Sequence, residues 1–239
     1  HTEDDLVALN AYDWDDSSIN FGPIEDLVVD GIKAAGGENV HKSFRIQPGV
    51  YPYPRGGTED CYIKNLTVRN VTGVTTFKMY LQTPAYTDKP EKNVGVGRLE
   101  NIIFENVTAD TTSPVDRQPN YLGGDPITGN FATFEVGSNV RGLAFRDVRV
   151  SLDRQKYPNS YFMIAGPKSQ YIAEKHLELF DPYVNCTAEQ IGYKNIYIND
   201  CLVRDLKPFI KEVKFDELYP SSLPFGKGKL VAVSEIQKD

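Results

Sequence analysis

Long apolar runs, metal-type cysteine spacing and an excess of basic charge are all missing from this 239-residue sequence. No apolar stretch reaches the roughly 18 residues that a membrane-spanning helix requires. The formal net charge of -7 and the pI near 5.1 argue against a nucleic-acid partner, because phosphate binding needs a basic surface. We expect Cys61, Cys186 and Cys201 to be small buried residues, with a Cys186–Cys201 bridge left open as an alternative.

The first five residues, His1 to Asp5, have neither the basic nor the apolar region of a signal peptide. We therefore expect either a mature chain or a chain that begins within a larger protein. The length fits one domain spanning residues 1–239, and a hydrophobic fraction of 40% is ample for its core.

A short motif recurs five times along the chain, beginning at Asp26, Asn65, Asn101, Gly142 and Asn195. Within each copy apolar and polar residues alternate, which is the period of a β-strand, and a turn sequence such as Asn-Val-Thr closes the copy. The intervals between copies are uneven. This pattern predicts a constant strand unit joined by connections of variable length.

A second apolar run lies between the copies, so that each unit holds at least two strands. These runs are Leu6–Leu9, Phe44–Gln47, Phe77–Tyr80, Phe131–Phe134, Tyr161–Ile164 and Leu230–Val233. The sequence therefore predicts an all-β fold, a right-handed parallel β-helix that lacks its N-terminal coils in this chain; a β-propeller or β-sandwich fits the repeats less well. We expect the best helical turn at Gln170–Phe180 and a C-terminal segment, about residues 207–239, that caps the last coil.

Four apparent glycosylation sequons begin at Asn65, Asn70, Asn106 and Asn185. In stacked coils, equivalent residues lie about 4.8 Å apart along the axis, so asparagine side chains can bond to those of the next coil. We expect turn or ladder roles for most of these asparagines.

Asp4 and Asp5 stand directly before the first apolar run. Glycosidic bond cleavage needs two carboxylates, one protonated as acid and one ionised to activate water or attack the sugar. A solvated acidic turn is the competing interpretation. Because neighbouring strand residues point to opposite faces, both can face one cleft only if the backbone bends or bulges.

Two segments carry a resemblance to a known family. Asp4–Leu9 is similar to the Asp-Asp-Cys-Ile-Ala-Ile segment of glycoside hydrolase family 28, the polygalacturonases and their relatives. Phe44–Gly49, followed by a Gly-rich loop and Tyr62–Val71, is similar to that family's Arg-Ile-Lys segment and the strand behind it. The resemblance covers roughly the first 110 residues and implies a parallel β-helix that hydrolyses pectic polysaccharides with inversion.

The resemblance implies roles for individual residues. Asp4 would be the general acid, and Asp5 would share activation of water with a further Asp that belongs one coil earlier and is absent from this chain. Arg45 would bind a carboxylate or hydroxyl of the substrate, and Tyr80, or with less support Tyr86, would line the same cleft.

The sequence also departs from the family pattern. No histidine stands at Asn20–Pro23, where the family has Gly-His-Gly, and His41 is the nearest replacement. Gln47 occupies the position of the family's Lys and is expected to contact substrate. Trp14, in a long connection, is a further candidate for stacking on a sugar ring.

These observations together predict an extracellular or periplasmic glycoside hydrolase acting on pectic or related acidic polysaccharides or oligosaccharides. We expect no cofactor, no bound metal, no nucleic acid and no membrane partner, and the oligomeric state stays open. Asp13, Asp15 and Asp16 could hold Ca²⁺, but their spacing is more typical of a solvated acidic turn. Two alternatives remain: a polysaccharide lyase that uses Ca²⁺ and Arg45, and a noncatalytic glycan-binding or structural β-helix.

Overall fold

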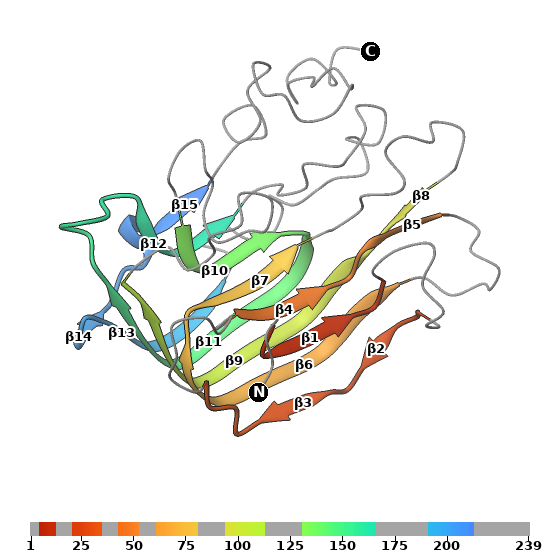
Figure 1. Ribbon diagram of the computed structural model, residues 1–239, viewed down its shortest axis with the longest axis horizontal. Helices are drawn as coiled ribbons and strands as arrows, with labels where there is room; N and C mark the ends of the chain where they lie inside the picture. The colour runs from red at the N-terminus through yellow and green to blue at the C-terminus, as the bar shows by residue number, and fades with distance from the viewer. Residues whose placement is uncertain are drawn as a thin grey trace, which may run out of the picture.

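The computed structural model describes residues 5–12, 21–34, 43–52, 61–80, 94–112, 131–165 and 191–212. These residues form an all-β structure with mainly parallel sheets, as the sequence predicts (Figure 1). Among them the only helical segment is a 3-10 turn at Lys207–Phe209. The described residues contain no helix with the length and hydropathy needed to cross a membrane.

Sheet A has six strands, and all its neighbouring pairs are parallel. In spatial order they are β1 (Val7–Asn10), β4 (Ser43–Gln47), β7 (Thr76–Tyr80), β10 (Phe131–Gly137), β12 (Ser160–Ala165) and β15 (Ile210–Glu212). Spatial order therefore follows sequence order from one edge of the sheet to the other.

In sheet B the spatial order of the strands also follows their sequence order. All its neighbouring pairs are parallel except the last pair, β13 and β14. Its strands are β2 (Ile24–Glu25) and β3 (Val28–Asp30), which both pair with β6 (Tyr62–Val74), then β9 (Arg98–Thr111), β11 (Asn139–Leu152), β13 (Gly192–Ile198) and β14 (Cys201–Val203). A separate antiparallel pair joins β5 (Val50–Pro52) to β8 (Val94–Val96).

The chain moves back and forth between the two large sheets. It passes from β1 in sheet A to β2 and β3 in sheet B, returns to β4, and repeats this path through β6 and β7, β9 and β10, and β11 and β12. In Figure 1 the strands of sheet A lie above those of sheet B. Each passage therefore adds one parallel strand to each sheet.

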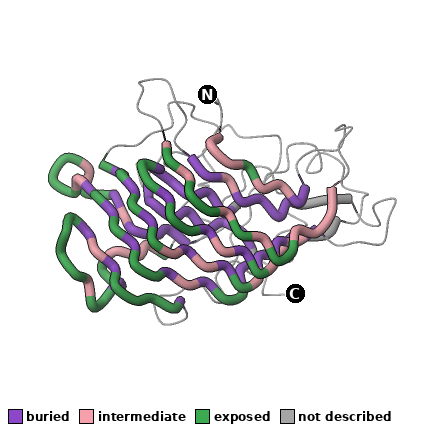
Figure 2. Tube along the Cα trace, turned by 90° about the horizontal axis from the view of Figure 1, so that it is seen from below, coloured by how far each residue is buried: buried purple, intermediate pink, exposed green. Residues whose placement is uncertain are grey.

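Aromatic rings from both sheets meet in the core between them. Phe44, Phe77 and Phe134 project from sheet A, and Phe104 and Phe145 project from sheet B; all five are fully buried. The rings of Phe77 and Phe134 stack at 5.0 Å, and those of Phe104 and Phe145 at 5.6 Å. Rings from the two sheets meet edge to face, with 5.0 Å between the ring centroids of Phe77 in sheet A and Phe104 in sheet B. Along sheet B, buried and exposed residues alternate (Figure 2), as expected for strands with one face in this core.

Asparagine ladders run across the outer side of sheet B. Asn65 donates through Nδ2 to Asp26 at 2.7 Å, and Asn101 donates in the same way to Asn65 at 2.9 Å. Asp26, Asn65 and Asn101 all have φ between 53° and 55°, in the left-handed region that asparagine and aspartate tolerate better than other non-glycine residues. Gly142, with φ 80°, continues the row on β11.

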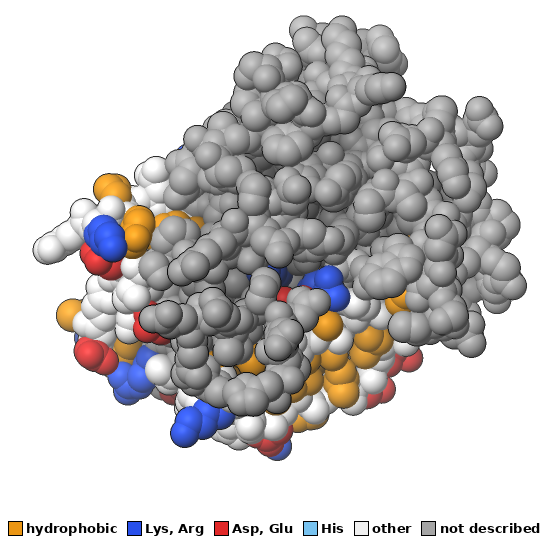
Figure 3. Space-filling model, viewed as in Figure 1, with side chains coloured by type: hydrophobic (Ala, Val, Ile, Leu, Met, Phe, Trp, Pro, Cys, Tyr) orange, Lys and Arg blue, Asp and Glu red, His pale blue; other side chains and the backbone are white. Residues whose placement is uncertain are grey.

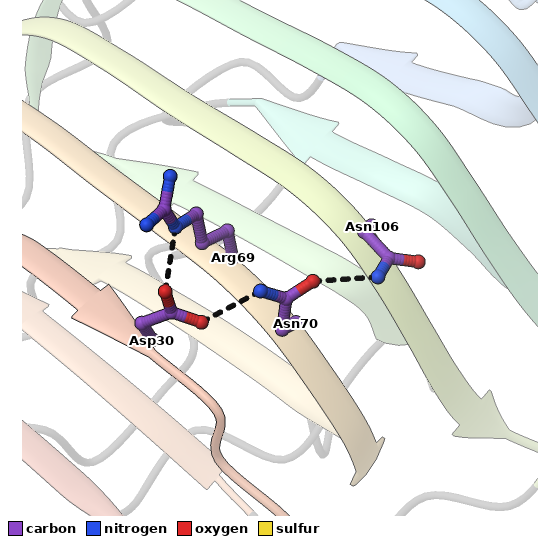
Figure 4. Close-up of polar contacts among 4 residues, drawn as sticks. All are labelled: Asp30, Arg69, Asn70 and Asn106. Carbon is purple, nitrogen blue, oxygen red and sulfur yellow. Dashed lines mark hydrogen bonds and ion pairs between the residues drawn. The ribbon is translucent and has the colours of Figure 1, made fainter.

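A second ladder begins at Asp30 (Figure 4). Asn70 donates to Asp30 and Asn106 donates to Asn70, both at 2.6 Å, while Arg69 Nε lies 2.7 Å from the other Asp30 oxygen. The hydrogen bond from Asn70, followed by that from Arg69, lowers the pKa of Asp30 below its ordinary value. The predicted ladder roles are thus confirmed for Asn65, Asn70 and Asn106, and Asn185 lies outside the described residues.

The alignment predicted for the motif copies is right for four copies and wrong for the fifth. The structure sets Asp26, Asn65, Asn101 and Gly142 side by side, but it pairs Asn195 with Asp147, to which Asn195 donates at 2.7 Å. Each long strand contains two left-handed turn residues five positions apart, such as Asn65 and Asn70. A copy with a single Asn turn can therefore be aligned with either turn position of the neighbouring strand. The sequence alignment placed Asn195 opposite the first position, Gly142, whereas the structure places it opposite the second, Asp147.

Other expectations are met only in part. Cys61 is buried as predicted, whereas Cys201 is an exposed free thiol; Cys186 lies outside the described residues. Residues 207–212 form the 3-10 turn and β15, which extend sheet A. The rest of the predicted cap, residues 213–239, and the predicted helical turn at residues 170–180 lie outside the described part of the chain.

Candidate functional site

A row of charged residues crosses the outer face of sheet A. Arg45 on β4 lies opposite Lys78 on β7, and Lys78 lies opposite Glu135 on β10. Each residue directly follows one of the core phenylalanines, so strand alternation turns it away from the core. Neighbouring strands are about 4.8 Å apart, which brings these three residues, the charged row, into one compact group.

Asp5 joins the charged row at its β1 end. Its Oδ2 lies 3.1 Å from Nε of Arg45, and its Oδ1 accepts a hydrogen bond from the Ser43 hydroxyl. The side chain of Asp5 is 9% exposed and that of Arg45 is 15% exposed. Two residues that are far apart in sequence are thereby held as an ion pair because β1 and β4 are adjacent parallel strands.

Lys78 and Glu135 are more deeply buried, at 3% and 2% exposure. Burial of a charge is unfavourable unless an opposite charge or several hydrogen bonds accompany it, and apolar residues of similar size are often as stable. The sequence of charges from Asp5 to Glu135 is negative, positive, positive, negative. Four largely buried charged side chains are not needed for packing, since apolar side chains of similar size are often as stable. The charged row together with Asp5 is therefore the candidate site.

This arrangement is suited to an anionic ligand. Arg45 and Lys78 are two adjacent cations, and Arg presents a planar set of donors that matches a carboxylate. Asp5 stands beside them as a fixed carboxylate, held by a hydroxyl and a guanidinium. Two cations can thus orient a bound anion while the neighbouring carboxylate accepts a proton.

Gln47 lies apart from the charged row, and its predicted contact with substrate stays a prediction. Its side chain is fully buried, and its Nε2 donates to the backbone oxygen of Tyr12 at 2.9 Å. Gly49, at φ 83°, lies so close to Tyr12 that an added Cβ would come within 2.6 Å of the tyrosine Cβ. The Gln47–Gly49 segment therefore fixes the packing of β4 against the residues after β1.

Of the other predicted site residues, Tyr80 ends β7 and its backbone pairs with Gly137 on β10. Its role stays a prediction. Asp4, Trp14 and His41 lie outside the described residues, so their roles stay predictions as well.

Lys78, Glu135 and Ser43 are members of the site that the sequence reasoning missed. The predicted apolar run Phe131–Phe134 ends one residue before Glu135, and the structure pairs Phe134 with Phe77 and Phe131 with Ser160. A Phe followed by a charged residue occurs at Phe44-Arg45, Phe77-Lys78 and Phe134-Glu135. The same dipeptide also occurs at Phe104-Glu105 and Phe145-Arg146 on sheet B, so by itself it does not single out the charged row.

Within the described ranges there is no group of three or more His, Cys, Asp or Glu side chains placed to hold a metal ion. Comparison of the chain with models of known protein families, with curated proteins and with solved structures found no match.

Proposed function

We propose that this chain is a glycoside hydrolase that cleaves acidic polysaccharides of the pectic type. The observation that carries the proposal is the ion pair between Asp5 and Arg45. The family resemblance gives these two residues neighbouring roles in one cleft, and they come from separate segments of the sequence. Lys78 supports the same proposal, because it supplies a second cation beside Arg45 where the sequence has Gln47 in place of the family's Lys.

The proposed fold is a right-handed parallel β-helix. Three features support it: the alternation of the chain between two parallel sheets, the asparagine ladders and the stacked core phenylalanines. Parallel crossover connections are almost always right-handed, which favours that hand here.

In the proposed reaction Arg45 and Lys78 bind a carboxylate of the substrate, and Asp5 removes a proton from the attacking water. Asp4, assigned as acid by the resemblance alone, gives a proton to the leaving oxygen as the glycosidic bond breaks. Because large pectic polymers do not enter cells, the proposed location is extracellular or periplasmic.

The test is the Asp5→Asn variant, assayed for release of reducing ends from polygalacturonate and from branched pectic oligosaccharides. We expect kcat to fall by at least about 100-fold, since general acid–base catalysis contributes about that much or more. Asp110→Asn is the matched control: Asp110 is an exposed carboxylate at the end of β9 that bonds to Thr112. This variant should keep full activity.

The products distinguish the proposal from its alternatives. Unsaturated uronate products, detected by ultraviolet absorbance and lost on chelation, would mean a lyase. Binding without any product would mean a noncatalytic glycan-binding protein. An Asp5→Asn chain that melts like the parent and keeps full hydrolytic activity would overturn the role of Asp5.

A further inference from the structure

The outer face of sheet B carries two rows in which charge alternates from strand to strand. One row runs through Glu25, Lys64, Glu100 and Arg141, and the other through Asp30, Arg69, Glu105 and Arg146. In Figure 3 basic and acidic side chains lie close together along the lower and left margins of the molecule. Opposite charges on neighbouring strands are favourable, and like charges directly opposite are unfavourable.

The alternation breaks at β13. An acidic residue is expected opposite Arg146, but the residue there is Lys194, and both side chains are exposed. Acidic neighbours only partly offset this pair: Glu105 faces Arg146 from β9, and the carboxylate of Asp147 accepts a hydrogen bond from Asn195. The register of sheet B thus retains an unfavourable like-charge pair at its surface.

An aromatic ring accompanies the excess of cations. The Arg149 guanidinium lies 4.1 Å from the centroid of the Tyr197 ring, on the strand next to it. Tyr193 does not belong to this face, because it lies opposite the core residue Phe145, whereas Lys194 lies opposite the exposed Arg146. Tyrosine and arginine together offer flat apolar surface and directed hydrogen bonds.

We propose that this β11–β13 face, formed by Arg146, Arg149, Lys194 and Tyr197, binds a polysaccharide that carries carboxylates. A uronate carboxylate at Arg146 and Lys194 would neutralise the like-charge pair, and a sugar ring would lie against Tyr197. The chain as a whole has a net charge of -7, so attraction of an anionic polymer requires a local excess of cations such as this one. The face lies on the opposite sheet from the charged row, and its binding does not depend on hydrolysis.

The test uses Lys194→Glu, which completes the alternation. Binding to polygalacturonate is measured by calorimetry at low ionic strength in an Asp5→Asn background, so that no cleavage occurs. We expect the affinity to fall by about tenfold or more, because charge-assisted contacts are lost. We also expect the melting temperature to rise by about 1–3 °C, because a like-charge pair becomes an opposite one.

Lys64→Glu is the matched control, with the same change of charge on the same face. It should lower the melting temperature, because Lys64 lies opposite Glu100 and its loss brings like charges together, and it should leave polygalacturonate affinity unchanged. Equal losses of affinity in both variants, or no binding by the parent, would overturn the proposal. Equal affinity for dextran sulfate and polygalacturonate would overturn the uronate assignment.

The experiments can distinguish failure of the proposed hydrolase function from failure of the proposed binding face. Hydrolysis is assayed in the chain with Asp5 intact, and its absence together with Lys194-dependent binding would overturn only the hydrolase. Hydrolysis with no binding at the β11–β13 face would overturn only the present inference.

Discussion

Sheets A and B both carry rows of charged residues in register, but they hold them in different surroundings. On sheet B the charged side chains are mostly exposed, and buried and exposed residues alternate along β9. On sheet A, β10 is buried along its whole length, and Lys78 and Glu135 are almost fully hidden. Exposed opposite charges help to set strand register at little energetic cost, whereas hidden charges are unfavourable and point to use in binding or chemistry.

The two sheets should differ most in the loss of stability caused by removing one cationic side chain from each. Lys78→Met should lower the free energy of unfolding by about 3 kcal/mol, because it removes one member of a buried set of ionisable groups and leaves the buried Glu135 opposite an apolar side chain. Unfolding in urea, followed by circular dichroism, measures this loss.

Lys64→Met is the corresponding change on sheet B. Lys64 lies opposite Glu100 at the solvent-facing side, and its loss should cost no more than about 0.5 kcal/mol. Similar losses for the two variants would show that burial does not separate the two rows.

The asparagine ladder gives an intermediate effect. Asn70→Ala removes the donor to Asp30 and the acceptor for Asn106 and also places alanine at φ 54°, so we expect a loss of about 2 kcal/mol in urea unfolding. Asn70→Gly tolerates the positive φ and should lose about half as much. If the two variants were equally unstable, the left-handed backbone would contribute nothing to the difference.

The smallest effect is a pH dependence on sheet B. The pKa of Asp30 is lowered by its hydrogen bonds, so its contribution to stability is fully present above the ordinary value of 3.8 and is lost as the pH falls through the lower folded value. The parent should therefore melt above Asp30→Asn at neutral pH, and the gap should narrow as the pH falls below 3.8. A gap that stays constant down to the lowest pH at which both fold would contradict the assignment.

Much of sheet B could be predicted because its strands repeat one sequence motif in which an asparagine marks the position of a turn. Asparagine tolerates the left-handed turns, so the motif copies at Asn65 and Asn101 mark equivalent positions directly. The copy at Asn195 was misplaced because two such turns lie five residues apart and each resembles the other.

Sheet A was less visible in the sequence. Its strands are short and lack a turn residue that fixes their alignment, and the predicted run Phe131–Phe134 ends one residue before Glu135, which lies opposite Lys78. The contact between Asp5 and Arg45 depends on the pairing of β1 with β4, which the stacking of the two apolar runs and the family resemblance led us to expect. Charged neighbours across strands are determined by register, and register follows from the packing of the whole core.

The asparagine ladders also bear on how the protein can be produced. The Nδ2 atoms of Asn65, Asn70 and Asn106 lie in glycosylation sequons, and each donates a hydrogen bond to the preceding strand of sheet B. A eukaryotic secretory host would attach sugars to these nitrogens during synthesis, before the neighbouring strands, about 4.8 Å apart, have come together. In such a host, glycan attachment would therefore compete with folding. In a host without N-glycosylation, the asparagine side chains can form the ladder hydrogen bonds.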